Sequence, residues 1–87
     1  MIERETMVVN PLGLHARPAA QLVKLASTFQ SEIELVKDGM PVNGKSIMGV
    51  MMLAAENGSS IMVRAQGADE AAAVAALSAL IASGFGE

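Results

Sequence analysis

Cysteine is absent from this chain of 87 residues, and its only aromatic residues are Phe29 and Phe85. Without cysteine, neither disulfide bonds nor thiolate metal sites can form. A single histidine makes a structural metal site improbable as well. The scarcity of aromatic residues and the net charge of −3 argue against a nucleic-acid binder. We therefore expect no metal, no other cofactor and no nucleic-acid partner.

Long apolar runs are also absent, since no segment approaches the ~18 residues of a membrane span. The charged start Met1–Glu5 lacks the apolar run of a signal peptide. A cytoplasmic protein without membrane insertion is therefore expected. Apolar residues still make up 52% of the chain, enough for one core at this length but not for two. We predict a single domain over residues 1–87.

Asn10–Ala20 is the most informative stretch, because it holds the only histidine of the chain. Asn-Pro and Gly13 predict a turn before His15, and Pro18 suits the first turn of a helix. Apolar residues then recur at intervals of three and four up to Phe29, which predicts a helix over about 16–28.

Alternating apolar residues predict strands over 2–9, 32–36, 41–43 and 60–66, and Asp38-Gly39 predicts a hairpin between the middle two. We expect the first strand at or near a sheet edge, and Pro41 places the short return strand at an edge too. Further helices are expected over 47–55 and after Asp69. The order β-α-β-β-α-β-α predicts an α+β fold, a four-stranded antiparallel sheet with three helices on one face.

The second helix is expected to begin at Ser46, a favoured N-cap residue. Val50 and Leu53 would then face the core, while Ile47, Met48 and Met51 would be partly exposed.

The last helix is predicted to have Asp69 as its cap and Glu70 in its first turn, where a negative charge meets the positive end of the helix dipole. Gly84 suits the position that ends this helix, with Phe85 folding back onto the last turn. The expected buried stripe consists of Val74, Leu77, Leu80 and Ile81.

His15 is the candidate reactive residue. At a helix N-terminus, free N–H groups and the dipole form an anion site, to which Arg17 adds a delocalised positive charge. The same dipole favours the neutral, nucleophilic imidazole. The backbone N–H groups of Ala16 and Arg17 would bind the transferred group, whereas Pro18 has none to give. A lone surface histidine is the alternative, but these neighbours favour reversible phosphoryl transfer.

Two motifs carry a family resemblance: Gly13-Leu14-His15-Ala16-Arg17-Pro18-Ala19-Ala20 and Lys45-Ser46-Ile47-Met48-Gly49-Val50-Met51. Together they resemble the HPr phosphocarriers of the bacterial phosphoenolpyruvate-dependent sugar phosphotransferase system, and the resemblance covers the whole chain. It implies an open-faced β-sandwich. The chain departs from the family pattern at Leu12, where several family members carry a polar residue. Leucine cannot form the side-chain hydrogen bond to the histidine ring that a polar residue could form.

By this resemblance, His15 accepts a phosphoryl group on Nδ1 from Enzyme I and passes it to an Enzyme IIA domain, and Arg17 steadies the group in transit. The protein would be a monomeric carrier without turnover of its own. Partners would dock on an apolar patch with a basic rim, a surface that suits acidic partners. The residues expected in this patch are Ala20, Lys24, Ile47, Met48 and Met51, with the stem of Arg17.

Ser46 has two interpretations that the sequence leaves open. It is a sufficient N-cap by itself, but its context also resembles family members that are phosphorylated at this serine by a dedicated kinase, with a phosphorylase as the reverse partner. A phosphate there would obstruct docking without unfolding the helix.

Two alternatives to a sugar-branch carrier remain at this stage. A carrier of the nitrogen-related branch uses the same chemistry with other partners, and a purely regulatory relative binds partners without carrying phosphate. The His15/Arg17 pair argues against the regulatory relative. The sugars and acceptor proteins cannot be predicted from this chain.

Overall fold

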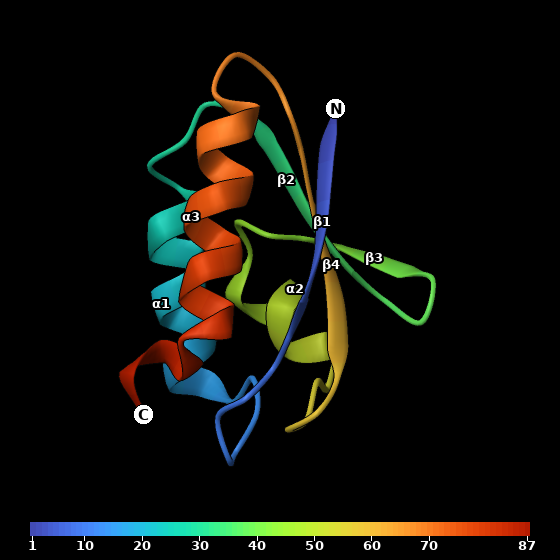
Figure 1. The fold of residues 1–87 in the computed structure, drawn as a ribbon, viewed down its shortest axis with the longest axis vertical. Helices are drawn as coiled ribbons and strands as arrows, with labels where there is room; N and C mark the ends of the chain where they lie inside the picture. The colour runs from blue at the N-terminus through green and yellow to red at the C-terminus, as the bar shows by residue number, and fades with distance from the viewer.

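A four-stranded antiparallel sheet forms one layer of the computed structural model, which describes all residues 1–87 (Figure 1). Its strands are β1 (Ile2–Met7), β2 (Glu32–Lys37), β3 (Met40–Asn43) and β4 (Ser60–Gln66), in the spatial order β1-β4-β2-β3. The predicted strands and their antiparallel arrangement are confirmed, and β1 and β3 lie at the two edges as expected.

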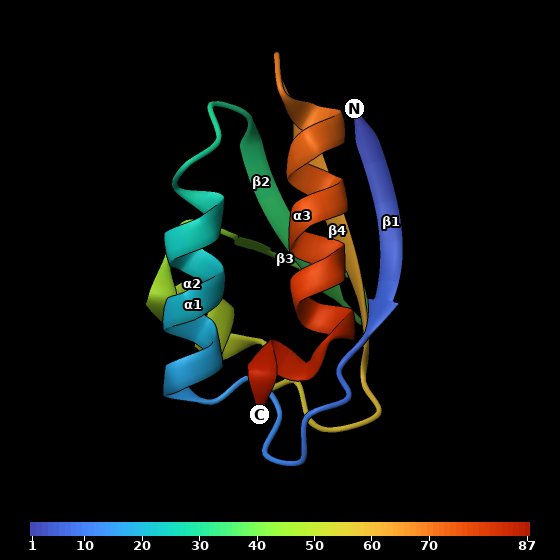
Figure 2. The ribbon, with the colours of Figure 1, turned by 60° about the vertical axis from the view of Figure 1, so that its left-hand side comes forward.

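Three α-helices form the second layer: α1 (Ala16–Ala26), α2 (Ile47–Met52) and α3 (Glu70–Ala82). Figures 1 and 2 show α1 and α3 side by side over one face of the sheet, with α2 against α1. The open-faced α+β fold predicted from the sequence is therefore confirmed. A short 3₁₀ segment, η1 (Gly84–Gly86), follows α3 and brings the end of the chain next to the start of α1 (Figure 2).

The core lies between the two layers and consists of 18 buried apolar residues. Strand β4 contributes Ile61, Val63 and Ala65 to it, as their alternation predicted. On the open face, Arg64 lies between two carboxylates, Glu3 on β1 at 3.6 Å and Glu34 on β2 at 3.4 Å. The sheet is therefore apolar on the side of the helices and crossed by ion pairs on the other.

Several elements end earlier than the sequence pattern suggested. Strand β1 ends at Met7, because Val8 turns inward and exchanges backbone hydrogen bonds with the loop at Gly58 and Ser59. Helix α1 ends at Ala26, where the hydroxyl groups of Ser27 and Thr28 donate to carbonyl groups of its last turn.

Asp69 is the N-cap residue of α3, as predicted, and its carbonyl accepts from the backbone N–H of Ala73 at 2.9 Å, but its carboxylate makes no capping bond. Its oxygens instead accept hydrogen bonds from the backbone N–H groups of Gln30 and Ser31 and from the Ser31 hydroxyl. The start of α3 is held by Glu70, whose carboxylate accepts from the backbone N–H of Gly67 at 3.2 Å. Asp69 therefore ties the segment before β2 to the start of α3, a long-range contact that local capping rules do not reveal.

Replacing Asp69 by asparagine is expected to flatten the acid side of the stability profile. The hydrogen bond from the Ser31 hydroxyl, followed by that from the Gln30 amide, lowers the pKa of Asp69. A lowered folded-state pKa contributes stability at pH values above the unfolded-state pKa, and this contribution is lost as the pH falls through the folded-state pKa. Urea unfolding between about pH 6 and pH 2 should show this loss in the wild type and less of it in Asp69→Asn. The control is Asp38→Asn, which changes an exposed hairpin carboxylate, and a slope as steep in Asp69→Asn as in this control would contradict the prediction.

Candidate functional site

The loop before His15 is fixed by its own backbone and by one buried side chain. Gly13 donates its N–H to the carbonyl of Asn10, and the Asn10 side-chain amide donates back to the carbonyl of Gly13 at 2.6 Å. Leu14 then donates to the carbonyl of Ala55, in the segment after α2, at 2.9 Å. These bonds join the loop to α2 and leave His15 at the N-cap of α1.

His15 caps α1 only through its backbone. Its extended conformation places its carbonyl to accept from Ala19 at 3.0 Å, and its side chain makes no capping bond. The N–H groups of Ala16 and Arg17 have no acceptor within the protein, and no acidic residue occupies the first turn. Unpaired donors at the positive end of a helix bind anions. The structure thus brings together the three residues from which the sequence predicted an anion site.

The guanidinium of Arg17 forms no salt bridge, and its residue is exposed. It is therefore free to contact an anion bound at the start of α1, which its planar donor geometry suits. Pro18 is buried, so the proline serves packing as well as helix initiation.

Two residues at this site were not predicted from the sequence: Glu87 and Asn10. The His15 ring nitrogen Nε2 lies 3.1 Å and 3.3 Å from the two carboxylate oxygens of Glu87. The buried Asn10 amide also donates to Glu87, at 3.1 Å. The glycines around Phe85 signal a turn at this end of the chain, but only the tertiary structure shows that the turn leads to His15.

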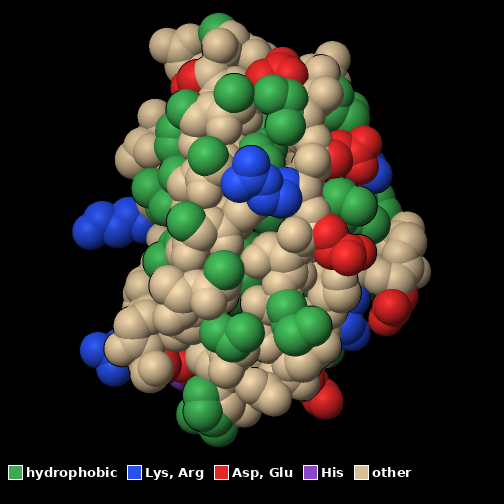
Figure 3. Space-filling model, viewed as in Figure 1, with side chains coloured by type: hydrophobic (Ala, Val, Ile, Leu, Met, Phe, Trp, Pro, Cys, Tyr) green, Lys and Arg blue, Asp and Glu red, His purple; other side chains and the backbone are tan.

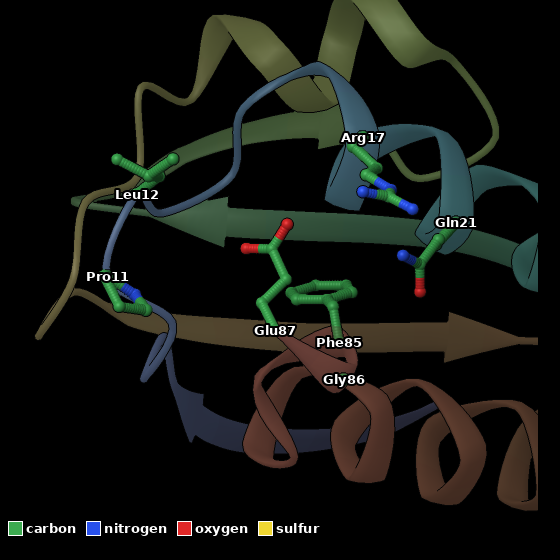
Figure 4. A pocket seen from close by; sticks show the side chains of 7 residues that line it. All are labelled: Pro11, Leu12, Arg17, Gln21, Phe85, Gly86 and Glu87. Atoms are coloured by element: carbon green, nitrogen blue, oxygen red, sulfur yellow. The ribbon is translucent and has the colours of Figure 1, made fainter.

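A pocket of about 430 Å³ opens beside these residues (Figure 4). Figure 4 shows Arg17 and Gln21 projecting from α1 toward the Phe85 ring, with the Glu87 side chain directed toward the start of α1. Leu12 stands on the opposite rim and is 75% exposed. The pocket is lined by Pro11, Leu12, Arg17, Gln21, Phe85, Gly86 and Glu87.

The predicted docking residues lie on two helices that pack against each other, α1 and α2. Ala20 and Lys24 are exposed on α1. On α2, Ile47, Met48 and Met51 are 45%, 77% and 43% exposed, so their predicted exposure is confirmed. Figure 3 shows basic side chains projecting at the edge of the molecule on the α1 side, and others at the centre of this face and at the opposite edge, where acidic side chains also gather.

Ser46 is the N-cap of α2, as predicted. Its hydroxyl accepts from the backbone N–H of Gly49 at 3.0 Å. Val50 and Leu53 are buried beneath α2, as expected. Lys45, the residue before Ser46, is held in place by its own side chain, whose Nζ donates to the carbonyl of Phe29 at 2.8 Å.

No group of three or more His, Asp or Glu side chains is arranged to hold a metal ion. None of the helices has the length and apolar character that crossing a bilayer requires.

Comparison with known proteins identifies the family. Residues 2–83 match the family model described as the PTS HPr component phosphorylation site. The phosphocarrier protein HPr of Cupriavidus necator is 51% identical over 100% of this chain and 98% of its own length. The crystal structure of HPr-C-His from Thermoanaerobacter tengcongensis is 48% identical, with a TM-score of 0.95 over 100% of this chain and 98% of that one. An HPr dimer from the same organism has a TM-score of 0.79, at 48% identity and with full coverage of both chains.

These matches define the class of protein as a phosphocarrier. The chain belongs to the HPr family of the phosphotransferase system, and the resemblance seen in its motifs is confirmed.

Proposed function

We propose that this protein accepts a phosphoryl group from Enzyme I on His15 and passes it to Enzyme IIA domains during sugar uptake. The observation that carries the proposal is the start of α1, where His15 is the N-cap residue and the N–H groups of the next two residues, Ala16 and Arg17, are unpaired. Because neither N–H group is hydrogen-bonded to an acceptor within the protein, both are available to donate to an incoming phosphoryl group. Arg17, free of salt bridges, supplies the balancing charge.

The transfer step needs only one new bond. The Nδ1 lone pair of His15 forms an N–P bond as the bond between phosphorus and its donor breaks. The N–H groups of Ala16 and Arg17 and the Arg17 guanidinium stabilise the phosphoryl oxygens, which is the positioning and charge stabilisation that such transfers require. Transfer to the acceptor reverses the step and restores the neutral ring.

The residues exposed on α1 and α2 are proposed as the docking surface. The exposed apolar side chains of Ile47, Met48 and Met51 lie on α2, which packs against the helix that carries the basic residues Arg17 and Lys24. This combination suits transient binding to acidic partner surfaces. Methionine side chains adapt to differently shaped partners, which suits a carrier that meets a donor and several acceptors.

We further propose that residues 1–87 act as one cytoplasmic, monomeric unit without catalytic turnover of its own. A carrier must present the same histidine face to successive partners, and an exposed face on a small monomer meets this need. Because a relative has been crystallised as a dimer, the oligomeric state of this protein should be checked by sedimentation at its working concentration.

The function is tested by incubation with Enzyme I and labelled phosphoenolpyruvate, followed by addition of an Enzyme IIA domain. Label that is acid-labile and base-stable, and that then leaves for the IIA domain, supports the proposal. A wild-type protein that takes up no label would refute it.

Phosphorylation of Ser46 is proposed as a regulatory step. With ATP and a serine kinase of this family's type, we expect an acid-stable label that is lost in Ser46→Ala but kept in Ser60→Ala, a control at an exposed serine. The phosphate would add about −2 charge beside the apolar docking residues, and we expect it to slow phosphoryl uptake from Enzyme I roughly 10-fold by weakening docking. Equal uptake rates for the modified and unmodified protein would leave Ser46 as a helix cap alone.

A further inference from the structure

None of the seven methionines of this chain belongs to the buried core. Six of them are exposed, and the seventh, Met62 on the open face of the sheet, is half-buried. Methionine often fills irregular gaps in cores, but here no methionine does so. The methionine side chains of this protein are therefore accessible to solvent and to reagents dissolved in it.

Three of these methionines share one face of α2. Met48, Met51 and Met52 stand at positions i, i+3 and i+4 of the helix, and they are 77%, 43% and 68% exposed. Val50 and Leu53 fill the core on the other side of α2. Neither α1 nor α3 contains a methionine. A change at the α2 sulfur atoms would therefore alter the surface of this helix without opening the core beneath it.

Methionine is also the side chain of this protein that a mild oxidant attacks, because the chain contains no cysteine, tryptophan or tyrosine. Hydrogen peroxide transfers one oxygen atom to the thioether sulfur, which is oxidised to a sulfoxide while the peroxide is reduced to water. Methionine sulfoxide reductases reverse the change. In the reverse step a dithiol is oxidised to a disulfide, and the oxygen atom leaves as water.

We propose that Met48, Met51 and Met52 form a modification site at which peroxide oxidation slows phosphoryl uptake by weakening the docking of Enzyme I. This role rests on the proposed carrier function and on α2 as part of its docking surface. A sulfoxide is polar, and a polar group that enters an apolar contact without a hydrogen-bond partner weakens binding. His15 lies at the start of the other helix and is not altered, so the KM for this protein should rise while kcat stays the same.

The first test maps the oxidised positions. The wild type is treated with hydrogen peroxide, and the gain of one oxygen atom at each methionine is followed over time by peptide mass spectrometry. Met48 and Met52 should be oxidised before the half-buried Met62. The melting temperature should stay within a few degrees, because surface changes have small effects on stability. Slower oxidation of Met48 and Met52 than of Met62 would overturn the proposal.

The second test compares initial rates of labelling by Enzyme I and phosphoenolpyruvate before and after oxidation. The peroxide is first removed with catalase, so that Enzyme I is not exposed to it. At carrier concentrations below KM, the rate for the wild type is expected to fall roughly 10-fold. It should recover after treatment with methionine sulfoxide reductases specific for both sulfoxide epimers.

Two leucine variants assign the effect to α2, each compared with its own rate before oxidation. The first combines Met48→Leu, Met51→Leu and Met52→Leu; it keeps an apolar helix face that peroxide cannot oxidise, so peroxide should not slow it. The matched control combines the same change at three methionines on the strands, and it should slow as much as the wild type: Met7→Leu, Met40→Leu and Met62→Leu.

The outcomes separate this proposal from the carrier function. An oxidised wild type that takes up label at its original rate would overturn the modification site and leave the carrier function intact. Equal slowing of the α2 leucine variant and the wild type would overturn it as well, because the effect would then come from other methionines. A wild type that takes up no label before oxidation would overturn both proposals.

Discussion

His15→Ala is expected to abolish phosphoryl uptake from Enzyme I. The chain contains no other histidine and no cysteine, so no second side chain of comparable nucleophilicity can form the intermediate. The loss should therefore be complete rather than partial, and the acid-labile label should disappear from gels at any incubation time.

The stability of His15→Ala separates this chemical loss from a folding defect. His15 caps α1 through its backbone carbonyl alone, and its side chain is partly exposed. We expect the melting temperature to remain within a few degrees of the wild type, since surface substitutions usually change stability by less than ~0.5 kcal/mol. Residual acid-labile label in a folded His15→Ala protein would place the carrier residue elsewhere.

Gly13→Ala is expected to have the largest effect on stability among substitutions near the site. Gly13 has a φ of +69°, and a Cβ atom there would lie 2.9 Å from Glu56 Cα and still closer to the carbonyl oxygen of Ala55. Left-handed backbone costs a non-glycine residue roughly 1–2 kcal/mol, and a clash with backbone adds roughly 1–3 kcal/mol. We expect about 3 kcal/mol of destabilisation, or roughly 15 °C in melting temperature for a domain of this size.

Gly39→Ala is the matched control for this substitution. Gly39 has a similar φ of +79°, but nothing lies within 4 Å of a Cβ atom added there. The free energy of unfolding of Gly39→Ala should therefore fall only by the cost of the left-handed backbone, about 1 kcal/mol. Gly13→Ala should also slow phosphoryl uptake, because the clash disturbs the bond from Leu14 to Ala55 that positions His15. Equal destabilisation in the two variants would show that close packing at Gly13 is unimportant.

Much of the fold follows from local patterns in the sequence. The alternation of Ile61, Val63 and Ala65 predicted the most deeply buried strand, and Ser46 marked the start of α2. These signals were sufficient because a strand face or a helix cap depends on residues only a few positions apart. Element ends were less predictable, since Val8 leaves β1 to bond with a loop some 50 residues away.

The candidate site was predictable where its parts are contiguous. His15, Ala16 and Arg17 occupy adjacent positions at one helix start, so their convergence follows from helix geometry. Glu87 and Asn10 could not be found in this way, because Glu87 reaches His15 across 72 positions through the left-handed turn at Phe85. The same holds for the carboxylate of Asp69: local rules placed this residue at the N-cap of α3, but its side-chain partner Ser31 is 38 positions away.

The central claim is that the phosphoryl group is carried on Nδ1 of His15, within reach of the N–H groups of Ala16 and Arg17. It is tested most directly by ¹H, ¹⁵N and ³¹P NMR of the uniformly ¹⁵N-labelled protein after reaction with Enzyme I and phosphoenolpyruvate. The account predicts phosphorus coupled to Nδ1 of His15 and altered amide resonances at Ala16 and Arg17. Phosphorus on Nε2 or on another residue, or unchanged Ala16 and Arg17 amides, would contradict it.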